Sequence, residues 1–200
     1  MKTSRRCLHA RSALGFTVIE LLLVVTIIGI VASIAVPGLL RARGSAAEAS
    51  AIGSLRVIHG AQINYATSCA SGYFAPSIET LATGTTYQGN KGQGNGQGKK
   101  IEVDSGFIGP EFTSDTTDRL PYRILFSAGA KATDGKASCN GVAAGETVGS
   151  FFVGADIISA TTGNVARYFG INQTGTVYES SKRIAAFYTG TPPSPARPLR

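Results

Sequence analysis

The chain has 200 residues, 43% of them hydrophobic, and a formal charge of +7, which suit one domain with a modest core beside a membrane segment. Four basic residues, Lys2, Arg5, Arg6 and Arg11, lie among the first 15 positions without an acid, so 15 basic and 12 acidic residues leave +3 elsewhere. That charge predicts no nucleic-acid partner. The one histidine beyond residue 15 is His59, which excludes a Ser-His-Asp triad and a multi-histidine metal site. We therefore expect no enzymatic activity, and we expect His59 to be a surface or interface residue.

Residues 21–40 form an uncharged run that directly follows the junction Gly15-Phe16-Thr17-Val18-Ile19-Glu20. As an α-helix, these twenty residues are long enough to cross roughly 30 Å of hydrocarbon. Placing Glu20 in lipid would cost about 2.5 to 3.5 kcal/mol, so this carboxylate needs a partner. If the chain were cut after Gly15, the new α-amine of Phe16 would be a cation four residues from Glu20.

These junction residues resemble the class III leader of the type IV pilin superfamily, which includes type IV pilins and the pseudopilins of type II secretion. The resemblance implies that a prepilin peptidase removes residues 1–15 and methylates the amine of Phe16. It also implies an ion pair between Glu20 and the Phe16 amine of a neighbouring subunit. Such a chain is a structural subunit of a type IV filament, and its partners are copies of itself, other pilin-like subunits and an inner-membrane assembly platform.

Two other interpretations of the N-terminus were weighed. An ordinary secretory signal, cleaved near Ser33-Ile34-Ala35, would have a shorter apolar stretch without an acid at its start. A plain single-span anchor fits the length but leaves Glu20 unexplained. In either case the alternative function would be a membrane-tethered periplasmic binding module, with an uncut N-terminal anchor in the second case.

The charges that flank the apolar run predict its orientation in the membrane. Although Arg41, Arg43 and Arg56 follow the run, the leader is more densely basic and lies closer to it, so we expect a cytoplasmic N-terminus and an exported remainder. The expected location is the bacterial inner membrane, as a single-pass chain, before assembly and a periplasmic or extracellular filament afterwards.

One helix is expected to continue from the apolar run, 16–40, through an amphipathic segment, 41–67. The second segment has no proline, and its apolar residues recur at spacings of three and four, at Ala51, Leu55, Ile58, Ala61 and Tyr65. Its glycines, Gly44, Gly53 and Gly60, each lower helix propensity by about 0.8 to 1 kcal/mol, so this half needs tertiary support. Pro37 removes a helical hydrogen bond and is expected to kink the helix, unless the membrane helix simply tolerates it.

Two cysteines, Cys69 and Cys139, remain beyond the leader, which contains Cys7. In the oxidising exported compartment they allow one intramolecular disulfide, whose loop of about 70 residues contributes roughly 4 kcal/mol in the chain-entropy model. We predict this Cys69–Cys139 disulfide, the alternative being two free or intermolecular thiols. Because this pair encloses the middle of the chain, unlike the C-terminal bridge of pilins, it favours a pseudopilin or a minor pilin. The sequence does not separate the two kinds of filament.

Residues 68–188 are expected to form the globular part. After a short helix that begins around Pro76, residues 84–100 read as a flexible glycine-rich loop. A phosphate-binding P-loop is excluded there because Gln93 stands where the motif needs glycine and Lys100 where it needs serine or threonine.

Short runs of aromatic and branched residues beyond the loop predict β-strands at 122–127, 150–157, 165–171 and 176–179, with a hairpin turn at Asn172-Gln173-Thr174-Gly175. The expected fold class is therefore α+β, and the resemblance implies a long N-terminal helix packed on a small antiparallel sheet. The proline-rich tail, 189–200, is expected to be disordered.

Acidic residues concentrate in the middle of the chain, at Glu102, Asp104, Glu111, Asp115 and Asp118. Some secretion pseudopilins bind calcium through loop oxygens, so the resemblance raises calcium as a ligand. The spacing matches no calcium loop, and Arg119 and Arg123 are available to pair with these acids. We therefore expect no cofactor.

Overall fold

The structure is a computed structural model that describes residues 15–83, 86–88, 100–102, 106–158, 167–188 and 190–199. For residues 86–88 and 100–102 it describes the backbone alone. The chain divides into two units, Met1–Leu40 and Arg41–Arg200. All of the expected leader except Gly15 lies outside the described residues.

The N-terminal unit holds the first half of α1 (Val18–Ser68), which contains Pro37. Every residue from 15 to 43 is exposed. Among the described residues, α1 is the one helix that is long and apolar enough to cross a membrane. The expected helix over 16–67 is therefore confirmed to within two residues at each end, while a kink at Pro37 stays a prediction.

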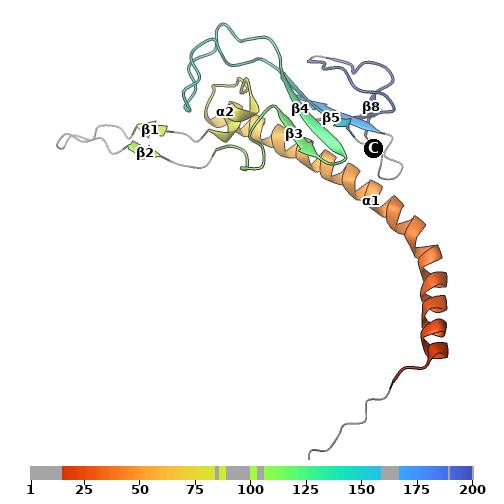
Figure 1. Cartoon of the computed structure of the whole chain (residues 1–200). Coiled ribbons are helices and arrows are strands. Elements are labelled where there is room, and N and C mark those ends of the chain that lie inside the picture. The colour runs from red at the N-terminus through yellow and green to blue at the C-terminus, as the bar shows by residue number, and fades with distance from the viewer. Residues whose placement is uncertain are drawn as a thin grey trace, which may run out of the picture. The chain divides into compact units, whose positions relative to one another are not determined.

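In the C-terminal unit, residues 41–68 of α1 pack on the sheet through the predicted apolar face (Figure 1). All five residues of that face are buried: Ala51, Leu55, Ile58, Ala61 and Tyr65. Gln62 lies on the same face, where its amide donates to the Ala75 carbonyl at 3.1 Å and accepts from the Ala75 N–H at 2.8 Å. The glycine-containing half of the helix thus has the tertiary support that its sequence requires.

Six antiparallel strands form the sheet, in the order in which they occur in the chain. They are β3 (Thr116–Arg119), β4 (Tyr122–Ala128), β5 (Phe151–Ile157), β6 (Tyr168–Asn172), β7 (Val177–Ser180) and β8 (Arg197–Pro198). The four predicted strands correspond to β4, β5, β6 and β7, and the predicted turn joins β6 to β7. There the Asn172 side chain accepts from the Thr174 N–H at 3.1 Å, and Gly175 takes a φ of 80°. The α+β class is confirmed.

The two faces of the sheet carry separate apolar clusters, as the alternation of side chains along a strand requires. Phe151 and Val153 of β5 face α1 in the main core, whereas Phe152 faces the other side with Tyr178, Ile184 and Phe187. The segment after β7 therefore covers part of the face that the helix leaves open.

Two expectations about loops are corrected. Within the expected flexible loop 84–100, the backbone of β1 (Thr86–Gln88) pairs with β2 (Lys100–Glu102), and the residues between these strands lie outside the described ones. Within the expected disordered tail, β8 pairs with β7. Pro198 has no N–H to donate, which an edge strand tolerates, and the next N–H, of Leu199, donates to the Val177 carbonyl at 2.8 Å.

The short helix α2 (Ile78–Ala82) begins two residues later than Pro76 suggested. Ser77 is its N-cap, and the Ser77 hydroxyl accepts from the Thr80 N–H at 3.1 Å. Pro76 precedes the cap, where its fixed φ sets the entry of the chain.

The predicted disulfide between Cys69 and Cys139 is present, with an S–S distance of 2.01 Å. Cys69 directly follows α1, and the N–H of Cys139 donates to the Cys69 carbonyl at 3.1 Å. The bridge therefore ties the C-terminal end of α1 to the loop that contains Cys139.

Replacing both bridge cysteines by serine should lower the free energy of unfolding by about 2 to 5 kcal/mol, because the unfolded chain regains the freedom of a long loop. Denaturant unfolding of the full chain in detergent, followed by circular dichroism, measures the loss. Cys7→Ser is the matched control and should unfold like the wild type. A double variant that unfolds at the wild-type denaturant concentration would contradict this role.

Candidate functional site

The junction of Gly15, Phe16 and Thr17 lies just outside the start of α1. Phe16 is 81% exposed. Thr17 acts as the N-cap, because its hydroxyl accepts from the Glu20 N–H at 3.3 Å and its carbonyl accepts from the Leu21 N–H at 3.2 Å. The pattern Thr-x-x-Glu is that of a capping box, a signal in the sequence that our sequence analysis did not use. The cap fixes where the helix starts and so places Glu20 in its first turn.

Glu20 is exposed in the first turn of α1. In that position its carboxylate complements the positive end of the helix dipole, which contributes roughly 0.3 to 1 kcal/mol at an exposed site. Within the described ranges, no ion pair involves Glu20. The helix thus accounts for part of the stabilisation of this charge and leaves the carboxylate open to a cation from outside the chain.

Around Glu20 the helix presents apolar side chains on every side. The large ones between residues 18 and 40 are 45% to 83% exposed. A continuous apolar surface of this extent is unfavourable in water and marks a contact with lipid or with other proteins. The N-terminal half of α1 is therefore a surface that needs an apolar environment.

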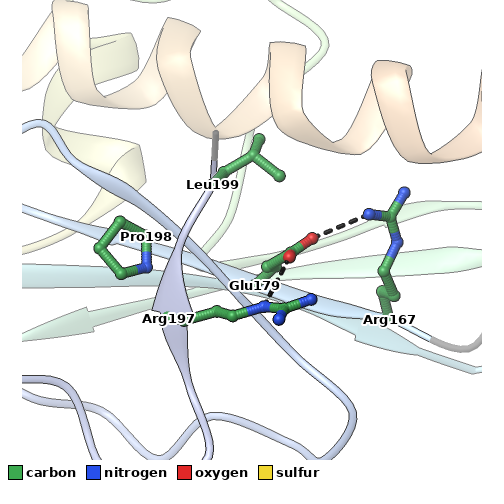
Figure 2. Close-up of a pocket in the computed structure, with 5 residues that line it drawn as sticks. All are labelled: Arg167, Glu179, Arg197, Pro198 and Leu199. Atoms are coloured by element: carbon green, nitrogen blue, oxygen red, sulfur yellow. Dashed lines mark hydrogen bonds and ion pairs between the residues drawn. The ribbon is translucent and has the colours of Figure 1, made fainter.

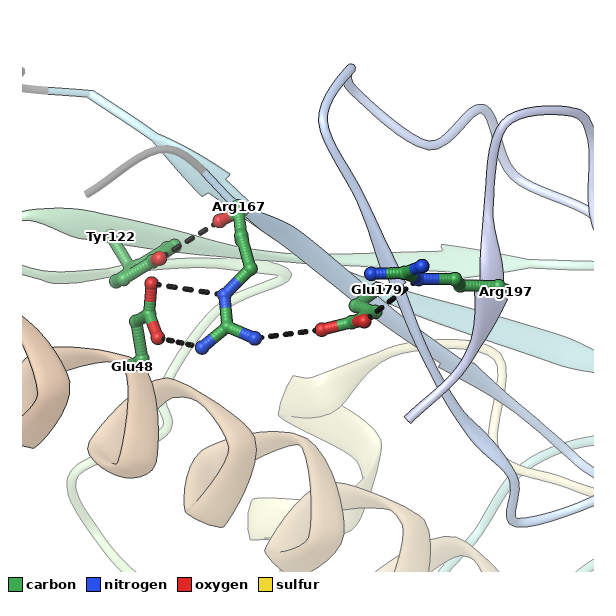
Figure 3. A network of polar contacts seen from close by, with 5 residues as sticks. All are labelled: Glu48, Tyr122, Arg167, Glu179 and Arg197. Atoms are coloured by element: carbon green, nitrogen blue, oxygen red, sulfur yellow. Dashed lines mark hydrogen bonds and ion pairs between the residues drawn. The ribbon is translucent and has the colours of Figure 1, made fainter. Parts of the chain in front are cut away.

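A second polar site, which the sequence analysis did not predict, lies between α1 and the sheet (Figure 3). The guanidinium of Arg167, just before β6, contacts both oxygens of Glu48 on α1 and donates to Glu179 Oε2 on β7 at 2.8 Å. Arg197 on β8 donates to Glu179 Oε1 at 2.9 Å. The Tyr122 hydroxyl donates to the Arg167 carbonyl at 2.8 Å. We call Glu48, Arg167, Glu179 and Arg197 the ion-pair network.

The burial of the two carboxylates explains why the arginines are needed. Glu48 is 13% exposed and Glu179 is 11% exposed, so each would carry a large desolvation cost without a cation. The hydrogen bond to Glu48 is the main cause that raises the pKa of Arg167, and burial followed by the Glu48 charge raises the pKa of Tyr122. Since all three nitrogens of Arg167 donate to carboxylates, the network acts as a clamp between helix and sheet.

A surface pocket of about 520 Å³ adjoins this network and is lined by Arg167, Glu179, Arg197, Pro198 and Leu199 (Figure 2). Its charges are two guanidinium groups and one carboxylate, and the second carboxylate of the network, Glu48, binds the first guanidinium. Its lining holds no histidine, cysteine or hydroxyl side chain to act as nucleophile or general base. The pocket is therefore explained by the packing of β8 against the sheet.

The acids raised as calcium ligands have separate partners where the structure describes them. Asp115 accepts from the Ile78 N–H at 2.7 Å at the start of α2, and Asp118 pairs with Arg123 at 2.7 Å, which lowers the pKa of Asp118. Asp104 and the side chain of Glu102 lie outside the described part. Among the residues that are described, no three His, Cys, Asp or Glu side chains gather into a possible metal site.

His59 packs within its own chain. It is half-buried, its ring lies 6.0 Å from the Phe151 ring, and its Nε2 is 3.5 Å from the Gln173 carbonyl oxygen. The expected surface or interface role is thus refined to a contact between α1 and the β6–β7 turn.

In comparisons with known proteins, no protein-family model, no curated protein and no solved structure matches this chain. Fold and site together define the protein as one with a long apolar N-terminal helix, a helix–sheet core closed by a disulfide, and a lone acid at the start of the helix.

Replacing Arg167 by methionine should lower the free energy of unfolding by about 1 to 3 kcal/mol, because Glu48 would remain buried without its cation. The loss should be greatest near neutral pH and should shrink as the pH falls, because protonating Glu48 removes the unpaired charge. Denaturant unfolding at several pH values measures both effects.

Arg123→Met is the matched control for Arg167→Met. Arg123 and Asp118 are 42% and 50% exposed, so losing this pair should cost less than about 1 kcal/mol. Equal losses for the two variants would show that the ion-pair network is no stronger than a surface pair.

Proposed function

We propose that this chain is a structural subunit of a type IV filament. A prepilin peptidase cuts after Gly15 and methylates Phe16, the helix resides in the inner membrane with its N-terminus in the cytoplasm, and subunits then polymerise through the apolar half of α1. The observation that supports this most directly is the position of Glu20, a lone carboxylate in the first turn of a helix whose next twenty residues are uncharged and exposed.

The exposed apolar half of α1 suits a subunit that exchanges one apolar environment for another. Lipid surrounds a single helix before assembly, and the helices of other copies replace the lipid in the filament. Because lipid and packed helices are similarly apolar, the exchange carries little hydrophobic driving force. Specific polar contacts must therefore decide how the helices align.

Glu20 and the amine of Phe16 are the groups that would supply this alignment. The apolar run has no charge of its own, so sliding one helix along another would change its packing only gradually. A carboxylate that must meet one cation fixes the axial register. Losing one member of a buried ion pair typically costs about 3 to 5 kcal/mol, enough to make the paired register strongly preferred.

The C-terminal unit fits the outer part of such a filament. Its disulfide suits an oxidising compartment, and its core is formed by the helix face and the sheet. The bridge joins the end of α1 to the middle of the chain, which favours a pseudopilin of type II secretion or a minor pilin over a major pilin used for adhesion, motility or DNA uptake. The alternative function is a membrane-tethered periplasmic binding module with an uncut anchor.

Mass spectrometry of the chain from native cells should find N-methylphenylalanine at residue 16 as the mature N-terminus. This measurement separates the filament subunit from the alternative, because a tethered module would keep Met1. A start at Val36 would indicate an ordinary signal peptide instead.

Glu20→Ala should be processed like the wild type but should not enter filaments, because the Phe16 amine of the neighbouring subunit loses its partner. The measurement compares processed protein in membranes with filament protein released by shearing. Glu20→Asp keeps the charge and serves as the matched control, with assembly retained at least in part. Filament yield at the wild-type level from Glu20→Ala would overturn the proposed role of Glu20.

A further inference from the structure

The turn between β3 and β4 carries the most exposed large apolar side chain of the described part of the C-terminal unit. Leu120 lies in this turn and is 77% exposed. Ile158, which directly follows β5, is 37% exposed, and its N–H donates to the Pro121 carbonyl at 3.0 Å. Leu120, Pro121 and Ile158 thus form a contiguous apolar projection, called the apolar tip below.

Contacts within the C-terminal unit place the apolar tip at the end of the unit where α1 enters it. Tyr122, the first residue of β4, contacts Arg167, which binds Glu48 on α1. The last residue of β4, Ala128, pairs with Phe151, whose ring lies beside His59. β4 therefore runs from the level of Glu48 towards that of His59, and the turn before it extends towards Arg41.

Chain connectivity brings this end of the unit close to the membrane, whatever the angle between the two units. Arg41 directly follows the uncharged run, and eight residues of helix from Leu40 to Glu48 rise about 12 Å. Two strand residues carry the tip about 7 Å back from the level of Tyr122. The tip thus lies about 5 Å beyond the level of Leu40, within a headgroup layer about 5 to 7 Å thick.

The charges at this end of the unit favour an anionic lipid surface. Arg41 and Arg43 are exposed on α1, and Arg119 precedes Leu120. The acids at this level, Glu48 and Asp118, pair with Arg167 and Arg123. The surface around the tip therefore carries an excess of positive charge, to which anionic headgroups are attracted.

We propose that the apolar tip inserts into the anionic headgroup layer of the membrane that holds α1 before the subunit is assembled. This inference rests on the proposed membrane location of the apolar half of α1. Because the span already tethers the unit to the bilayer, the tip works at high effective concentration and needs only a weak affinity of its own. The insertion orients the C-terminal unit on the membrane and keeps it from rotating freely about α1.

A single tryptophan can test this contact, because the chain contains none. Leu120→Trp places the probe at the tip. Ala137→Trp places it at an exposed site two residues before Cys139, at the opposite end of the unit, and is the matched control. Each full chain is reconstituted at low density in vesicles of phosphatidylethanolamine and phosphatidylglycerol, with or without lipid brominated near the top of its acyl chains. Circular dichroism checks that each variant is folded.

The Leu120→Trp emission should shift to shorter wavelength than that of Ala137→Trp, and brominated lipid should quench the tip probe alone. Replacing phosphatidylglycerol by phosphatidylcholine should weaken that quenching. Emission and quenching equal to the control would overturn the inference, and quenching unchanged without phosphatidylglycerol would overturn its electrostatic part. A shift that grows with protein density without quenching would overturn it in favour of contact between copies.

Resistance to carbonate extraction separates this inference from the proposed function. A chain that is extracted from the vesicles overturns the membrane location and the lipid contact together. A chain that stays integrated while its tip probe remains in water overturns the lipid contact alone.

Discussion

The packing of one face of α1 on the sheet is the interaction on which the rest of the C-terminal unit depends. Without that face the helix would carry its glycines unsupported, and β5 would lose the cover over Phe151. Two devices hold this contact near its ends: the Cys69–Cys139 bridge where the helix stops, and the salt bridge from Arg167 to Glu48 where the helix enters the unit. One device acts mainly through the unfolded chain and the other through charge compensation, so they protect the contact in different ways.

Local pattern was sufficient to predict much of this fold. The spacing of Leu55, Ile58 and Tyr65 predicted the buried face of α1, and β-branched and aromatic runs predicted the four central strands. β3 escaped because Thr116–Arg119 is polar, as an edge strand can be. β8 escaped because proline argues against a strand unless the edge position is known.

The sites divide in the same way. The junction around Gly15 and Glu20 is local, so the sequence alone suggested its role. The contact between Glu48 and Arg167 joins residues 119 positions apart, and no periodicity or spacing links them. Only the folded sheet brings these two together, which is why the ion-pair network could not be predicted while the disulfide, with two cysteines to pair, could.

The short strand β8 has a consequence for how such a subunit avoids the wrong kind of polymer. An open sheet edge is a template for further strands, and a protein concentrated in a membrane would meet many copies of its own edge. At one edge β8 covers β7, yet it offers little beyond itself, since it has two residues and one of them is Pro198. At the other edge β3 is short and ends in Asp118 and Arg119. Both edges therefore disfavour growth of the sheet from chain to chain, which leaves the apolar helix as the surface through which copies can associate.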